Sequence, residues 1–541
     1  MTDVDAAYDV VIRGGTLYDG SGSSPRVGDV AIRGDSIAAL GTVEGRGRHE
    51  LDATGLAVAP GFINMLSWAK ESLVADGRSQ SDIRQGVTLE VFGEGSSLGP
   101  LTDAMKANRR ERQSEVSYDI DWTSLDEGLQ WLVRRGISCN VASLVGATTL
   151  RIHEIGYVNR PPEAAELDRM RALMREAMQD GALGVGSSLI YAPAQFAATD
   201  ELVALAEVAA EYGGMYVSHI RNEGKQLLDA LEELIDIARR SGAAAEVWHF
   251  KASGPGNWPK MDQAIERIDA AQREGQRVTA DVYTYHASST GLDSTMPGWV
   301  QEGGHRAWVE RLKDASVRTR LRQELSTAAR QQENEFLSAE KILLVGFRNP
   351  ALRNLTGKTI AQVAAARGTS VEDTIMDLVV EDDSRVQCVF FTMSEENVRK
   401  AIALPWVAFC SDAGSLAAEG VFLKTSTHPR AYGSFARVLA KYARDERVVS
   451  VAEAVRRLSA FPADNLRLER RGRLREGYYA DVVVFDPDRI QDHATFDAPH
   501  QYATGVRDVF VNGIQVLKAG EHTDARPGRV VRGQGYRRGD R

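Results

Sequence analysis

Short, continuous apolar runs alternate with longer segments whose apolar residues recur every three or four positions through the middle of the chain. Residues 182–191, 214–220, 245–250 and 278–285 are such runs, and a helical segment follows each of the first three. Buried apolar strands that alternate with amphipathic helices are typical of a parallel sheet covered by helices. Because the alternation continues through most of the chain, we predict an α/β fold, a (β/α)8 TIM barrel.

The two chain ends show short β-rich runs broken by glycine, aspartate and asparagine. Residues 8–41 contain two run–turn–run segments, and residues 478–520 repeat the pattern, with Asn512-Gly513 as a strong tight-turn signal. These ends predict a small β-sandwich or β-barrel domain beside the large barrel. The predicted boundaries are 1–60 plus 468–541 for the small domain and 61–467 for the barrel, with a charged helical insertion near 291–341.

The charged insertion has more than one interpretation. A helical stretch this rich in arginine, glutamate and glutamine is usually a solvated face of a protein. Because it follows a barrel strand, it is also suited to form a lid over the mouth of the site. A surface that binds a partner is a further interpretation, although nothing in the charge pattern selects it.

Composition and charge narrow the class of protein. Of the 541 residues, 43% are hydrophobic and 26% are charged, which is the balance of a soluble globular protein. The 65 basic and 75 acidic residues give a net charge of −10, so we expect no nucleic-acid partner and no binding to an acidic membrane. No apolar run approaches the ~20 residues of a membrane span. The acidic N-terminus also lacks the pattern of a secretory signal.

The cysteine content points to a reducing compartment. Cys139, Cys388 and Cys410 are too few and too scattered for a disulfide framework. We therefore expect a cytoplasmic protein. The sequence leaves the oligomeric state open, and an oligomer is compatible with it.

Polar residues stand where four of the apolar runs end, which is where a (β/α)8 barrel carries its chemistry. His219 and His249 end two successive runs, Glu94 lies between glycines after another, and Asp412 ends the run at 406–412. Two imidazoles and two carboxylates suit a metal centre with a catalytic carboxylate. Plain structural interpretations are a satisfied polar group for each histidine, an exposed turn residue for Glu94 and a helix cap for Asp412.

Ordered sequence blocks across almost the whole chain resemble one family. The opening VIRGGTLYDGSG, the segment LDATGLAVAPGFIN and the tail GRLREGYYADVVVFDPDRIQDHATF are similar to its small β-domain. The barrel blocks follow in the family order: QGVT, GALGVGSSLIYAP, YVSHIRNEG, WHFKASG, FCSDAGS and THPRAYGSFARVLAKY. On these blocks the chain resembles the D-aminoacylase (N-acyl-D-amino-acid deacylase) family of the amidohydrolase superfamily.

The resemblance implies roles for individual residues and also shows departures from the family pattern. His219 and His249 fall on the two histidines that hold the tightly bound metal, and Asp412 falls on the essential aspartate of the last strand. In PGFINMLSW, Leu66 and Trp68 stand where the family has a His-x-His pair. Neither replacement can bind zinc.

These departures predict a single metal site. The His-x-His pair serves mainly the second, weaker metal position, so its loss leaves one site standing. Gly95 takes the place of the family's bridging cysteine, and Glu94 beside it is the natural third ligand, because a catalytic zinc usually has three protein ligands and a water. We expect bulky Trp68 to fill the vacated second site with apolar matter. The predicted cofactor is one Zn²⁺ per chain.

The resemblance implies zinc-dependent hydrolysis of the amide bond of N-acyl-amino acids, with Asp412 as general base and then general acid. An Nε-acyl-lysine acylase or a cyclic-amide hydrolase on the same scaffold is an alternative, and an inactive barrel acting as a binding protein is another. The expected partner is a small N-acylated amino acid, of D or L form. We do not expect His286 or His428 to bind metal, and His428 is predicted to support the loop after Asp412.

Family-like blocks also supply candidate substrate-binding residues. Lys251 matches a family lysine near the substrate, and its charge suits a substrate carboxylate. Tyr283 and Ser289 lie in a block that contributes to the substrate pocket, and Tyr191 and Arg221 are further candidates. Plain interpretations are an ion pair with a structural carboxylate for the lysine and a core position for Tyr283.

Overall fold

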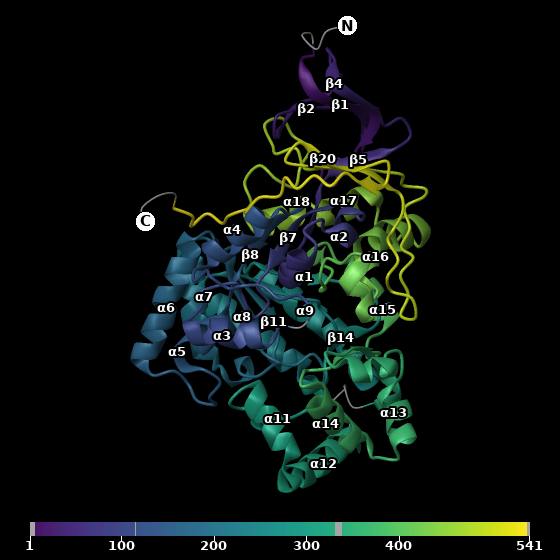
Figure 1. Cartoon of the computed structure of the whole chain (residues 1–541). Helices are drawn as coiled ribbons and strands as arrows, with labels where there is room; N and C mark the ends of the chain where they lie inside the picture. Colours follow the sequence, from purple (N-terminus) through teal and green to yellow (C-terminus); the bar gives the residue numbers. More distant parts are fainter. Residues whose placement is uncertain (1–5, 114, 331–337, 538–541) are drawn as a thin grey trace.

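The computed structural model describes residues 6–113, 115–330 and 338–537, and a barrel of parallel strands lies at its centre (Figure 1). One parallel sheet has the order β17-β13-β12-β11-β10-β9, and a second has the order β6-β7-β8. The sheets join where β8 leads into β9 and where the Met65 amide donates to the Phe409 carbonyl at 3.4 Å. The barrel strands are β6 (Phe62–Asn64), β7 (Val87–Phe92), β8 (Asn140–Ser143), β9 (Val145–Gly146), β10 (Gly184–Ser188), β11 (Met215–His219), β12 (Ala244–Val247), β13 (Val278–Val282) and β17 (Val407–Phe409).

Amphipathic helices cover the barrel where the sequence pattern places them. α7 (Thr199–Glu211), α8 (Leu227–Ser241) and α9 (Lys260–Arg273) follow β10, β11 and β12 and bury apolar residues in the same core as the strands. This alternation confirms the predicted (β/α)8 barrel. The other helices of this part are α1 (Ala69–Ala75), α2 (Gln80–Ile83), α3 (Asp103–Glu111), α4 (Leu125–Arg135), α5 (Ala147–Ile155), α6 (Ala164–Gln179), α15 (Glu395–Ala403), α16 (Arg430–Arg437), α17 (Val451–Leu458) and α18 (Ala460–Asn465).

Both chain ends meet in a nine-stranded sheet at one end of the barrel (Figure 1). The hairpin at Asn512-Gly513 forms as its sequence predicts, with positive φ at both residues. A Cβ at Gly513 would lie 2.0 Å from the Gly34 carbonyl oxygen, so only glycine fits there. The strands are β1 (Tyr8–Leu17), β2 (Arg26–Arg33), β3 (Ser36–Gly41), β4 (Gly47–Asp52), β5 (Ala57–Pro60), β18 (Val482–Phe485), β19 (Val506–Val511), β20 (Ile514–Lys518) and β21 (Glu521–His522).

A separate lobe lies at the opposite end of the molecule from the nine-stranded sheet (Figure 1). It extends past the predicted insertion, because β16 pairs with both β14 and β15. Its apolar side chains form a core of their own. Residues 331–337 of the predicted insertion lie outside the described residues. The lobe contains β14 (Ser288–Gly291), α10 (Gly298–Gln301), α11 (His305–Lys313), α12 (Ala315–Arg330), β15 (Ile342–Gly346), α13 (Ile360–Arg367), α14 (Val371–Asp382) and β16 (Gln387–Phe390).

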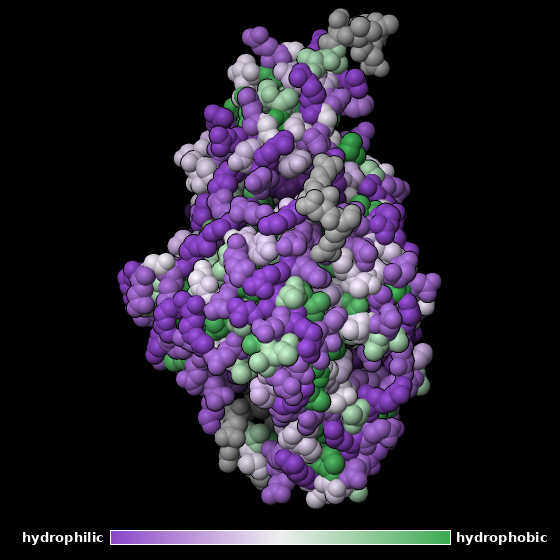
Figure 2. Space-filling model, turned by 90° about the vertical axis from the view of Figure 1, so that its left-hand side faces the viewer, coloured by the Kyte–Doolittle hydropathy of each residue, from purple (hydrophilic) through white to green (hydrophobic). Residues whose placement is uncertain are grey.

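The molecular surface is mainly polar on the face shown in Figure 2, where apolar side chains are scattered among hydrophilic ones. Within the described residues, no helix combines the length and the apolar character that crossing a membrane requires. Apolar side chains are concentrated instead in the barrel core, in the core of the lobe and in the core of the nine-stranded sheet.

Candidate metal centre and active site

The carboxyl ends of four barrel strands carry the residues that the strand-end rule selects. His219 is the last residue of β11, His249 follows β12 by two residues, Glu94 follows β7 by two, and Asp412 follows β17 by three. All four side chains are buried. His249 and Asp412 have positive φ angles of 39° and 48°. Such backbone conformations are uncommon outside glycine and are found often at functional sites.

Glu94, His219 and His249 direct ligand atoms at one another. His219 Nδ1 lies 2.9 Å from Glu94 Oε1, and His249 Nε2 lies 3.5 Å from the same oxygen. The two imidazole rings stand nearly perpendicular, with centroids 4.4 Å apart. Among the described residues, this is the one group of three or more His, Cys, Asp or Glu side chains whose ligand atoms all lie within 4.8 Å of one another.

This donor set fits a zinc ion. Zinc accepts imidazole nitrogen and carboxylate oxygen, and a catalytic zinc uses three protein ligands with a fourth position for water. Ligand atoms bound tetrahedrally to one zinc lie roughly 3.4 Å apart, close to the 2.9 and 3.5 Å that separate Glu94 Oε1 from the two imidazole nitrogens. Glu94, His219 and His249 are therefore the residues that would hold the metal.

The charges of these three residues are coupled. Burial acts to raise the pKa of Glu94, but the bonds from His219 and His249 outweigh it and hold that pKa well below its usual value. Burial and the Lys251 ammonium act to lower the pKa of His249, whereas Glu223 and Glu94 raise it to about 9. His249 is therefore mostly protonated at neutral pH without metal, and an incoming metal ion must displace that proton.

A second carboxylate, Glu223, contacts the Nδ1 side of the His249 ring, opposite the nitrogen that faces Glu94. Its Oε1 is 3.0 Å from His249 Nδ1. Burial acts to raise the pKa of Glu223, but the charge of Lys251 and of the two imidazoles holds it far below its usual value. An Nδ1–H that donates to Glu223 fixes the His249 ring so that Nε2 turns toward Glu94. Glu223 was not predicted from the sequence, although it stands four residues after His219 in the block YVSHIRNEG.

Lys251 lies inside the same network. Its Nζ donates to Glu223 Oε1 at 2.6 Å and to the His249 carbonyl at 3.0 Å, and it lies 2.8 Å from His249 Nδ1. With 5% of its surface exposed, the side chain is directed at the metal ligands. A direct contact between Lys251 and a substrate carboxylate stays a prediction.

Asp412 is held by two side chains from distant parts of the chain. Trp68 Nε1 donates to its Oδ1 at 3.1 Å, and Arg430 Nη1 lies 2.6 Å from its Oδ2. Arg430 was not predicted from the sequence, although the block THPRAYG contains it. The expectation that Trp68 fills the vacated second site with apolar matter stays a prediction, and the structure adds that its indole N–H faces the carboxylate.

Two of the predicted substrate-binding residues border this site directly. The Tyr283 ring lies beneath the Arg430 guanidinium, with its centroid 4.6 Å from Cζ, and its centroid is 6.4 Å from that of His249. The Tyr191 ring centroid is 5.4 Å from that of His219. Both aromatic rings therefore form walls beside the metal ligands.

The other two predicted residues have different surroundings. Ser289 Oγ donates to the Cys388 carbonyl at 2.8 Å, and the Ser289 carbonyl accepts from Arg430 at 3.2 Å. Ser289 thus contacts the site through its backbone. Arg221 forms an ion pair with Glu233 of α8 at 2.8 Å, so its charge is directed away from the metal ligands.

The histidines that were not expected to bind metal make other contacts. His428 Nε2 lies 2.9 Å from the Ala287 carbonyl, and its Nδ1 accepts from the Arg430 amide at 3.0 Å. These bonds anchor the backbone that carries Arg430. His286 Nδ1 faces Glu395 Oε2 at 3.7 Å.

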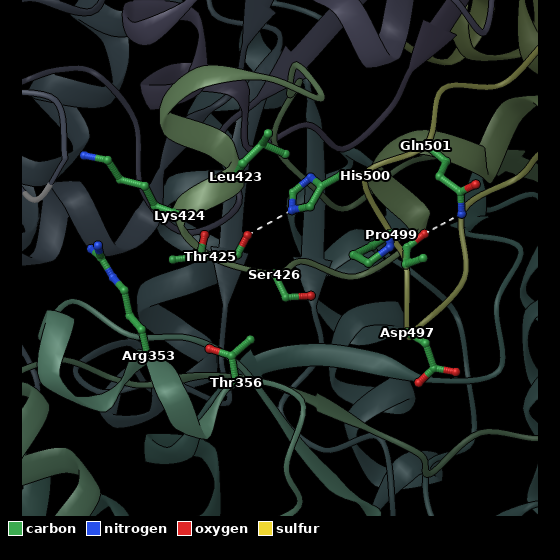
Figure 3. Close-up of a pocket in the computed structure, with 11 residues that line it drawn as sticks. Arg353, Thr356, Leu423, Lys424, Thr425, Ser426, Asp497, Pro499, His500 and Gln501 are labelled. Atoms are coloured by element: carbon green, nitrogen blue, oxygen red, sulfur yellow. Dashed lines mark hydrogen bonds between the residues drawn. The ribbon is translucent and has the colours of Figure 1, made fainter.

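A surface pocket of about 370 Å³ lies away from these residues (Figure 3). The lobe, the loop before His428 and the C-terminal part of the chain meet there. The two cations on its rim, Arg353 and Lys424, both form ion pairs with Glu115. The pocket therefore offers no unpaired cation to an anionic ligand. Its lining residues are Arg353, Thr356, Leu423, Lys424, Thr425, Ser426, Asp497, Ala498, Pro499, His500 and Gln501.

A (β/α)8 barrel with two histidines and a glutamate at its strand ends, and an aspartate after the last strand, defines a metal-dependent hydrolase. The model of the amidohydrolase family matches residues 140–517. The D-aminoacylase of Alcaligenes xylosoxydans xylosoxydans is 31% identical over 527 residues, which cover 97% of each chain. The chain belongs to the amidohydrolase family and, within it, to the D-aminoacylase (N-acyl-D-amino-acid deacylase) family.

Solved structures of relatives agree with this placement. A D-aminoacylase studied for its binuclear metal centre, with activation by one metal and attenuation by a second, is 30% identical and has a TM-score of 0.81, over 97% of this chain and 100% of that chain. The N-acyl-D-glutamate deacylase of Bordetella bronchiseptica, solved with zinc and a phosphonate that mimics the tetrahedral intermediate, is 30% identical and has a TM-score of 0.80, over 97% and 99%.

Proposed function

We propose that this chain is a zinc-dependent deacylase that hydrolyses the amide bond of N-acyl-D-amino acids and releases a carboxylic acid and a free amino acid. The observation that carries the proposal is the convergence of Glu94, His219 and His249 at the strand ends of a barrel that also keeps Asp412. The D-aminoacylase and N-acyl-D-glutamate deacylase among its relatives support the substrate class.

In the proposed reaction, three residues hold the metal and Asp412 transfers the proton. A zinc ion bound to Glu94, His219 and His249 would activate water and polarise the substrate carbonyl. Asp412 accepts the proton of the attacking water and returns it to the departing amine nitrogen. Because Trp68 and Arg430 each hold one oxygen of Asp412, the carboxylate keeps one orientation through both transfers.

Arg430 is the better placed of the two nearby cations to bind a substrate carboxylate. The Lys251 ammonium already donates to Glu223 Oε1 and to the His249 carbonyl. Arg430 lies between Asp412, Tyr283 and Ser289, and its buried Nε has no hydrogen-bond partner. A guanidinium in this position can form charge-assisted hydrogen bonds to a carboxylate.

The remaining expectations are part of the same proposal. The partner is a small N-acylated amino acid, and the net charge of −10 supports the expectation that no nucleic acid is bound. Cys139, Cys388 and Cys410 are buried free thiols, in keeping with a reducing, cytoplasmic location.

A substrate panel tests the proposal. Purified protein is assayed with N-acetyl-D-amino acids, N-acetyl-L-amino acids and Nε-acetyl-lysine, and zinc is measured on the same sample. We expect hydrolysis of the D compounds by protein that contains one zinc per chain. Equal trace activity on all three classes would contradict the substrate class. Protein without stoichiometric zinc and without hydrolysis after zinc addition would favour a binding protein instead.

A further inference from the structure

The carboxylate of Asp412 is buried, with 8% of the residue exposed, yet neither of its partners is a metal ligand. A buried carboxylate must recover the hydration that it loses from donors in the protein. Asp412 has two such partners: the indole N–H of Trp68 donates a hydrogen bond to Oδ1, and the Arg430 guanidinium forms an ion pair with Oδ2. Both present positive charge to the carboxylate, as a bound cation would.

Backbone hydrogen bonds fix Trp68 beside Asp412. The Asp412 amide donates to the Leu66 carbonyl at 3.0 Å, and the Trp68 amide donates to the Ala413 carbonyl at 2.9 Å. The Lys70 ammonium lies 5.2 Å from the centroid of the indole ring. The segment after β6 and the segment after β17 are thus tied together, so the backbone of Trp68 stays beside that of Asp412 although Trp68 itself is 37% exposed.

We propose that Trp68 is the positioning residue for Asp412, and that its indole N–H and the Arg430 guanidinium occupy the place of a second metal ion. The inference rests on the proposed function, in which Asp412 moves the proton. It also goes beyond that function, because it explains how Asp412 is held in a chain with only one set of metal ligands.

The chemistry of the two altered positions excludes a second ion. Leu66 is fully buried hydrocarbon with no lone pair. An indole N–H is a donor only and offers no lone pair to a metal. A divalent cation at Asp412 would also meet the positive charge of Arg430, which lies 2.6 Å from Oδ2. All three side chains therefore act against a second ion beside Asp412.

Trp68→Phe tests the positioning role, because phenylalanine keeps an aromatic ring and removes the N–H. We expect kcat to fall about 10- to 100-fold, the effect of losing one hydrogen bond to a charged group, with KM and the zinc content unchanged. A kcat within twofold of the wild-type value, or a loss of zinc from this variant, would overturn the proposal. The second result would place Trp68 in support of the metal site instead.

Trp406→Phe is the matched control. Trp406 Nε1 donates to Asp269 Oδ1 at 2.8 Å, so the substitution removes the same kind of bond. Trp406 precedes β17, at the opposite end of that strand from Asp412. We expect this variant to keep the kcat of the wild-type protein. A fall in kcat equal to that of Trp68→Phe would show a general cost of losing an indole–carboxylate bond and would overturn the proposal.

A zinc count gives a readout that does not depend on activity. With zinc in excess, we expect one ion per wild-type chain and two per chain of the triple variant Leu66→His, Trp68→His, Arg430→Ala, in which none of the three excluding side chains remains. A second ion bound by Asp412 in the wild-type protein, or a triple variant that still binds one, would overturn the exclusion. If no acylated substrate is hydrolysed, the proposed function fails, while the zinc count still decides the occupation of the second site.

Discussion

The active site has two sides, the candidate metal ligands and Asp412, and they differ in the source of the positive charge beside them. Glu94, His219 and His249 direct their ligand atoms at one another, so this side can receive an ion once the imidazole protons are released. At Asp412, an indole N–H and a guanidinium already face the carboxylate. Under our proposal, one metal position is kept for chemistry, and side chains supply the positive charge at the other. The following predictions test this contrast, from the largest expected effect to the smallest.

Removing one of the candidate metal ligands should abolish both zinc binding and activity. For His219→Ala we expect no stoichiometric zinc and activity at background, because Glu94 and His249 alone make a poor zinc site. Metal analysis and hydrolysis are measured on the same sample. His305→Ala, which removes a histidine paired with Asp383 in the lobe, is the control and should keep its zinc. A zinc-loaded His219→Ala protein would mean that the ligand set is different.

Removing the carboxylate should instead leave the metal in place. For Asp412→Asn we expect kcat to fall by about 10² to 10⁴, the usual contribution of general acid–base catalysis, with one zinc per chain retained. Asp269→Asn, which alters the partner of Trp406, should change neither quantity. An active, zinc-loaded Asp412→Asn variant would refute the role of Asp412. Loss of zinc from Asp412→Asn would show that Asp412 also supports the metal site, which would contradict the difference between the two sides.

Replacing Glu223, which contacts His249, should weaken zinc binding less than replacing one of the candidate ligands. For Glu223→Gln we expect zinc affinity to weaken about 10- to 100-fold, because the His249 ring loses the charged acceptor at its Nδ1. The measurement is competition with a chelator of known affinity. Glu233→Gln removes a similar carboxylate, paired with Arg221 outside the site, and should have no effect. Equal affinities of both variants would show that Glu223 does not orient the ligand.

Zinc affinity should also depend on pH, and it should rise with pH because His249 must lose a proton before it binds the metal. The pKa of His249 is raised to about 9 in the metal-free protein, so a proton competes with zinc below that pH. We expect the affinity to rise about tenfold per pH unit between roughly pH 7 and 8.5 and to level off above about pH 9. Calorimetry in buffers of different ionisation enthalpy measures the released proton. An affinity that does not change with pH would contradict the assignment.

The sequence predicts the part of the site that depends on strand ends. His219, His249, Glu94 and Asp412 each follow an apolar run, and a parallel barrel brings such positions to one rim. Neither Glu223 nor Arg430 could be selected in this way. Glu223 lies in the loop after β11 and Arg430 is the first residue of α16, so neither ends an apolar run, and their contacts depend on how the chain folds back over the rim.

The direction of a polar atom was the least predictable property. The sequence shows that Trp68 has no lone pair to offer to zinc. Its indole carries one N–H, however, and the sequence does not say which way this group points. Lys251 shows the same limit, because its charge is evident from the sequence, but its burial against Glu223 depends on the closed barrel.

The backbone bonds between the segments that follow β6 and β17 have a consequence for how the protein matures. We expect barrel closure to bring Trp68 to Asp412, because the Asp412 and Trp68 amides bond across the junction of the two segments. Newly synthesised chains would leave folding with this half of the machinery already assembled. In a cell short of zinc, we expect folded but inactive chains to accumulate. Each would become active on binding one ion.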